Sequence, residues 1–98
     1  MKKFLVERFI PEIGKQPQEK LLKGIIKGSE ILDDMGPDIT WIESYVMHNR
    51  LYCVYLAKNE ETLREYVKRS GRPCNCIGEV ISTLDPSMLE EQSDSTIS

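Results

Sequence analysis

The feature that most constrains the fold of this chain is the order of its strand-like and helix-like segments. Four segments are rich in β-branched and aromatic residues, which favour strands, at residues 4–10, 39–47, 51–57 and 77–84. Two further segments repeat apolar residues at three- and four-residue spacing, which favours helices, at residues 17–35 and 59–70. The order β-α-β-β-α-β predicts the ferredoxin-like α+β fold, a four-stranded antiparallel sheet of order 4-1-3-2 with two helices on one face.

The ends of these segments carry their own signals. Pro17 is pre-set for the first turn of a helix, and Gly36 with Pro37 ends that helix. Asn59 is a good N-cap for the second helix, and Gly71 suits the position just after its end. These signals agree with the predicted order of elements.

Size and charge narrow the class of protein. A chain of 98 residues is long enough for one modest core, so we expect a single domain over residues 1–86 and a polar C-terminal tail over 87–98. No apolar run approaches the roughly 20 residues of a membrane span, and charged residues interrupt the start before a signal sequence could form. The formal net charge of −3, without a basic stripe, argues against nucleic acid as a partner. We therefore expect a soluble cytoplasmic protein.

Both faces of the predicted sheet are apolar, because side chains alternate between the faces of each strand. The set expected to meet the helices is Phe4, Val6, Ile10, Ile42, Val46, Tyr52, Val54, Leu56, Val80 and Leu84. The second set is Leu5, Glu7, Phe9, Trp41, Glu43, Tyr45, Met47, Leu51, Cys53, Tyr55, Ile77, Glu79 and Ile81. Two helices cover only one face, and such an apolar second face exceeds what monomers usually expose. We expect a homodimer, sheet against sheet, as an α+β barrel, and the C-terminal tail folded over this face is the alternative.

Three glutamates interrupt this second face, one on each of three predicted strands. If the fourth strand lies beside the first, Glu7 and Glu79 can be cross-strand neighbours. Carboxylates gathered in a covered site need a shared proton, a cation or a metal ion. The candidate metal ligands are Glu7, Glu43, Glu79 and Cys53, with Trp41, Tyr45 and Tyr55 as the lining of the pocket. The plainer alternative is that the glutamates lie at the rim of the face or form ion pairs.

The three cysteines are expected to be reduced thiols, since their number is odd and no secretory signal accompanies them. Cys74 and Cys76 lack a second pair at zinc-finger spacing, and the single histidine, His48, lies in a predicted turn elsewhere. We expect Cys74 and Cys76 to be small residues at the junction between a loop and the fourth strand.

Several segments together resemble a known family. They are VER from Val6, MGPDITWIESYV from Met35, LYCVYLAKNEE from Leu51 and GRPCNCIGEV from Gly71. As a set, over about residues 3 to 86, they resemble a small bacterial family named after a nickel-responsive, nickel-binding protein of actinobacteria. The resemblance implies a ferredoxin-like homodimer with a metal-binding role, and the positions that match are Glu7, Tyr45, Tyr52, Cys53 and Glu79. Position 43 departs, because Glu43 stands where relatives carry a more basic residue.

Two functions from different classes follow. The first is a non-enzymatic, metal-responsive binding protein that holds nickel or another divalent metal ion in the glutamate-lined pocket at the dimer interface. The second is a small dimeric enzyme in which a glutamate of raised pKa moves a proton on a small organic substrate. A third alternative is an interaction module whose second face serves only to dimerise.

Overall fold

The computed structural model describes residues 1–90, and its sheet confirms the predicted topology. Its four strands form one antiparallel sheet in the order β2-β3-β1-β4, which is the predicted order read from the opposite edge. The strands are β1 (Lys2–Phe9), β2 (Ile39–Val46), β3 (Arg50–Ala57) and β4 (Cys76–Val80). The two long central strands, β1 and β3, therefore have a neighbour on each side.

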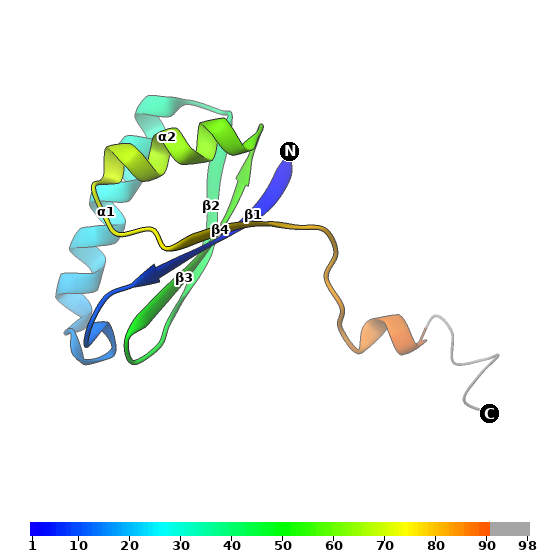
Figure 1. Cartoon of the computed structure of the whole chain (residues 1–98), viewed down its shortest axis with the longest axis horizontal. Coiled ribbons are helices and arrows are strands. Elements are labelled where there is room, and N and C mark those ends of the chain that lie inside the picture. Colours follow the sequence, from blue (N-terminus) through cyan, green and yellow to red (C-terminus); the bar gives the residue numbers. More distant parts are fainter. Residues whose placement is uncertain (91–98) are drawn as a thin grey trace.

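Two long helices pack on the same side of this sheet, as Figure 1 shows. They are α1 (Gln18–Met35) and α2 (Glu60–Ser70), and a short 3-10 helix, η1 (Ile13–Lys15), follows β1. The Asn59 side chain caps α2 by accepting a hydrogen bond from the Thr62 amide at 2.8 Å. Gly71 ends α2 with φ 66°, in the left-handed region that favours glycine.

The core lies between the sheet and α2. Phe4 and Val6 of β1 pack there with Leu63 and Tyr66 of α2, and all four are almost fully buried. By contrast, α1 contributes only partly buried side chains, and Ile25 and Ile26 remain 41% and 57% exposed. The apolar side of α1 is therefore only partly buried, because a cavity lies beneath this helix.

The strand register corrects the predicted sorting of side chains into faces. Val6 pairs with Cys53 of β3 and with Ile77 of β4, and residues directly opposite in an antiparallel pair share a face. The side chains of β1 are sorted correctly, but those of β3 and β4 are inverted relative to them. Since every strand is apolar on both faces, hydrophobicity alone could not decide which face of β3 belongs with which face of β1.

In β2, a β-bulge is a second reason why the predicted sorting of side chains into two faces fails. The register shifts between Trp41, which pairs with Tyr55, and Glu43, which pairs with Val54. A bulge inserts one residue, so strict alternation fails across it. Trp41 therefore lies on the helix side while Glu43 lies on the opposite face, although the sequence placed both on one face.

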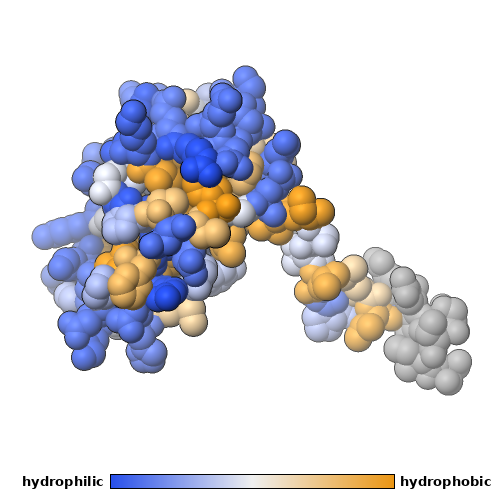
Figure 2. Space-filling view, viewed as in Figure 1, coloured by the Kyte–Doolittle hydropathy of each residue, from blue (hydrophilic) through white to orange (hydrophobic). Residues whose placement is uncertain are grey.

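The fourth strand ends earlier than predicted. It stops at Val80 rather than Leu84, and the segment that follows leads away from the body (Figure 1). Figure 2 shows hydrophobic residues along this segment, where Ile81 and Leu84 are 83% and 79% exposed. Up to residue 90 the segment does not cover the second face of the sheet, and residues 91–98 of the predicted tail lie outside the described part. Within residues 1–90, no helix combines the length and apolar character needed to cross a membrane.

Candidate functional site

The face of the sheet opposite α1 and α2, which we call the open face, carries the Glu7 carboxylate, and two neighbouring side chains contact it. The Tyr52 hydroxyl of β3 donates a hydrogen bond of 2.8 Å to Oε2 of Glu7, its direct partner on β1. Arg50 Nε lies 3.7 Å from the same oxygen, in a partly exposed ion pair. The hydrogen bond to Glu7 raises the pKa of Tyr52, so this phenol stays protonated as a donor. These two contacts orient the Glu7 carboxylate on the open face.

The neighbour of Glu7 on β4 is a thiol and not a second carboxylate. The register pairs Glu7 with Cys76 and pairs Phe4 with Glu79. Phe4 is a core residue on the helix side, so Glu79 lies on the opposite face from Glu7 and is exposed. The predicted neighbourhood of Glu7 and Glu79 is therefore wrong, and the open face offers a carboxylate and a thiol on adjacent strands.

Glu43 shares the open face but is remote from Glu7. It lies on β2, with β3 between it and β1, which separates the two backbones by about 9–10 Å at ordinary strand spacing. The Tyr45 hydroxyl donates a short hydrogen bond to the Glu43 carboxylate, and this bond raises the pKa of Tyr45. Tyr45 and Glu43 form a second exposed polar pair on the open face.

The remaining predicted site residues lie on the helix side. Cys53 and Tyr55 of β3 are each 3% exposed and face the core, so Cys53 cannot join Glu7 at one ion. Trp41 also faces the helices and donates a hydrogen bond of 2.9 Å from Nε1 to Ser44 Oγ. Within residues 1–90, no three His, Cys, Asp or Glu side chains come close enough together to hold a metal ion. The four predicted ligands are not gathered within one described subunit.

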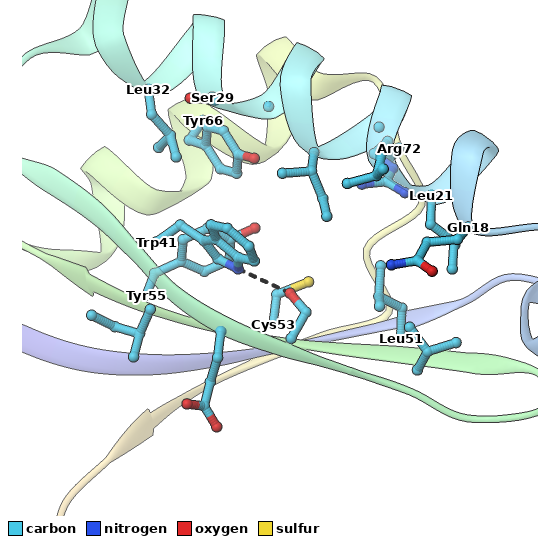
Figure 3. Close-up of a pocket in the computed structure, with 18 residues that line it drawn as sticks. Gln18, Leu21, Ser29, Leu32, Trp41, Leu51, Cys53, Tyr55, Tyr66 and Arg72 are labelled. Atoms are coloured by element: carbon cyan, nitrogen blue, oxygen red, sulfur yellow. Dashed lines mark hydrogen bonds between the residues drawn. The ribbon is translucent and has the colours of Figure 1, made fainter.

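A cavity of about 380 Å³ opens between α1 and the sheet, and it was not among the features predicted from the sequence. Figure 3 shows α1 above the cavity and β2 and β3 below it, with the Cys53 sulfur directed into the space between them. Trp41 and Tyr55 line it, as predicted for a pocket, but this pocket lies on the helix side and excludes Tyr45. The two glycines of α1 that line it, Gly24 and Gly28, are the sequence signal that could have indicated it.

Buried charge lies beside this cavity. Arg8, next to Glu7 in sequence, is 1% exposed and donates a hydrogen bond of 3.0 Å from Nη1 to the Pro73 carbonyl. Burial acts to lower the pKa of Arg8, but the Tyr55 hydroxyl and the Cys53 thiol beside it raise the value overall. The guanidinium is therefore cationic inside the core, and among residues 1–90 its Nε has no hydrogen-bond partner.

Comparison with known proteins gives a family and a fold. The family model described as "Nickel responsive protein SCO4226-like" matches residues 4–80. The crystal structure of SCO4226 from Streptomyces coelicolor A3(2) is similar with a TM-score of 0.70 at 14% sequence identity, over 84% of this chain and 99% of that chain. At this identity the likeness supports the fold, in agreement with the sheet order above. No curated protein matches the chain.

Proposed function

The chain belongs to the family of nickel-responsive proteins similar to SCO4226, and on that premise we propose that it is a homodimer that binds nickel or another divalent metal ion on the open face of its sheet. The observation that carries the proposal is the register, which sets Glu7 beside Cys76 on the face opposite α1 and α2. Its role is that of a non-enzymatic, metal-responsive binding protein.

The chemistry of this pair suits a late transition-metal ion. Cβ atoms of directly opposed residues on adjacent antiparallel strands lie about 4.5–5.5 Å apart, within which a carboxylate oxygen and a thiolate sulfur can reach one ion. Thiolate favours softer ions such as nickel or zinc over magnesium or calcium, which prefer oxygen alone. The hydrogen bond from Tyr52 and the ion pair with Arg50 orient the Glu7 ligand, as second partners of metal ligands commonly do.

Within residues 1–90 one subunit brings together two such donors and no third, which supports a site shared by two copies. A two-fold axis near the pair would bring Glu7 and Cys76 of both subunits together, giving four donors from one repeated contact. The open face also carries apolar side chains that stay partly exposed and that a second copy would cover, at Leu5, Leu56 and Val80. Metal binding and dimer formation are therefore expected to strengthen each other.

The experiment is native mass spectrometry and calorimetric titration of tag-free protein with nickel chloride, with zinc and magnesium chloride for comparison. We expect a dimer that takes up one nickel ion, and no comparable uptake of magnesium. Glu7→Gln and Cys76→Ser should each lower nickel affinity at least about tenfold, as the loss of one ligand would.

The chain offers a matched control for each variant. Glu79→Gln changes a glutamate on the other face, and Cys74→Ser changes the cysteine two residues before Cys76. Both should retain the nickel affinity of the unaltered protein. Full affinity in Glu7→Gln, or loss of affinity in Glu79→Gln, would contradict the assignment of this face, and a monomer that binds nickel fully would contradict the shared site.

A further inference from the structure

The cavity on the helix side has the dimensions of a small-molecule site. Its volume of about 380 Å³ lies within the range of roughly 300–1,000 Å³ common for ligand pockets. At about 30 Å³ for each water molecule, it has room for about a dozen waters or an organic molecule of similar size. It lies across the sheet from Glu7 and Cys76, so it is separate from the proposed metal site.

Its walls are mostly apolar and come from opposite layers. The apolar side chains that line it are Leu21, Leu22, Ile25 and Leu32 of α1, and Trp41, Ile42, Val46 and Leu51 of the sheet. On α1, the glycines at positions 24 and 28 also line the cavity. A Cβ at Gly28 would lie 2.7 Å from the Tyr66 hydroxyl, and one at Gly24 would lie 3.3 Å from Arg72 Nη2. The missing Cβ atoms therefore leave room for two polar groups against α1.

One of these polar groups is an unpaired cation. The Arg72 guanidinium lines the cavity, is only partly exposed, and has no carboxylate partner among residues 1–90. Elsewhere on the surface, Arg64 and Arg69 each pair with an acidic side chain. An unpaired guanidinium beside apolar walls is a ready partner for an anion, since charge-assisted bonds to carboxylate are strong and directional.

The inner wall of the cavity adds hydrogen-bonding groups. The rings of Tyr55 and Tyr66 lie 5.2 Å apart, and Figure 3 shows both among the residues that surround the cavity, together with Cys53. Arg8 lies beside Tyr55 and Cys53 and contributes a second positive charge close to this wall. The one acidic residue of the lining, Glu43, has its carboxylate bonded to Tyr45 of the open face. The local charge thus favours a negative ligand.

We propose that this cavity binds a small organic carboxylate with an apolar body, its head group on Arg72 and its body between α1 and the bulged part of β2. The apolar walls select the body, and the Arg72 guanidinium selects the negative head. The exposed apolar residues of α1 and the incomplete packing beneath it follow from the same space, which a ligand would fill.

The test uses octanoate, which has about ten non-hydrogen atoms and fits the volume, and its neutral analogue octanamide. Calorimetric titration at neutral pH, without added metal, should show that octanoate binds about 10- to 100-fold more tightly than octanamide, the range expected for a charge-assisted bond. Arg72→Gln should remove this preference, while Arg64→Gln, which changes an exposed arginine outside the cavity, should retain it. Equal binding of the two ligands by the unaltered protein, or binding of neither, would overturn the proposal.

A second pair of variants tests the location by shape. Ile25→Trp replaces an aliphatic side chain of the cavity wall with a bulky indole ring. Ile26→Trp makes the same change at the next residue of α1, outside the lining. Octanoate affinity should fall at least about tenfold in the first and stay unchanged in the second. Unchanged affinity in Ile25→Trp would place octanoate elsewhere and overturn the proposal. Glu7→Gln should bind octanoate normally, which separates this outcome from that of the metal site.

Discussion

Two consecutive residues of β1 compare the two faces of the sheet directly. Glu7 points to the open face with its side chain 32% exposed, while Arg8 points to the helix side and is 1% exposed. Both are charged, but water still reaches Glu7, whereas Arg8 depends on a carbonyl, a phenol and a thiol inside the core. A charged side chain therefore loses little hydration free energy on the open face and much more on the covered face.

The contrast indicates what each face is built to do. The partly hydrated Glu7 carboxylate lies beside the exposed Cys76 thiol. Both groups can exchange water for a metal ion or a second subunit with little loss of hydration free energy. A buried guanidinium such as that of Arg8, whose Nε has no hydrogen-bond partner among residues 1–90, lowers the free energy of unfolding unless something compensates for it. A functional reason for its presence is therefore expected. Three substitution experiments can test this difference between the faces, and the one that should lower stability most comes first.

The first compares two phenylalanines of β1. Phe4→Ala removes a core ring that is 1% exposed and should lower the free energy of unfolding by about 3–5 kcal/mol. Phe9→Ala, at a ring 44% exposed, should lower it by less than about 1 kcal/mol in dilute protein. Urea unfolding at several protein concentrations measures both. If the open face is buried in a dimer, the loss of unfolding free energy in Phe9→Ala should grow with protein concentration. A loss in the monomer equal to that of Phe4→Ala would contradict the difference between the two faces.

The second prediction concerns the effect of the Arg8 side chain on the free energy of unfolding. Arg8→Met replaces the buried cation with an apolar side chain of similar length and should raise the free energy of unfolding by roughly 1–2 kcal/mol. Arg50→Met, on the open face, should change it by less than about 0.5 kcal/mol, because its ion pair with Glu7 is partly exposed. Chemical denaturation compares the two variants. A clear loss of stability in Arg8→Met would mean that the guanidinium holds the core together.

The third uses pH to probe the covered face. Burial, with the nearby Cys53 and Tyr66, raises the pKa of Tyr55 well above its usual value. Above about pH 10 the unfolded state therefore loses this proton while the folded state keeps it. The free energy of unfolding should fall there, by up to about 1.4 kcal/mol per pH unit for this one group. Tyr55→Phe should lessen that fall, and Tyr45→Phe, on the open face, should change it much less.

The sequence was sufficient for the elements and their order, because their signals are local. Periodicity identified α1 and α2, while Asn59 and Gly71 marked the ends of α2, where the structure shows a cap and a left-handed residue. The site was predicted less well. Glu7 was identified and lies on the open face, but Glu79 and Cys53 were placed with it and lie on the other side.

Local patterns along the chain were enough to predict a ferredoxin-like fold, a sheet with apolar residues on both faces, and a family. Which residues meet across strands became clear only in the folded molecule, because register depends on non-local backbone pairing and on one bulge in β2. That pairing placed Cys76, expected to be a minor residue of a loop-to-strand junction, beside Glu7. It also turned Cys53, Tyr55 and Trp41 toward α1, where only the packing of two layers creates a cavity beneath a helix.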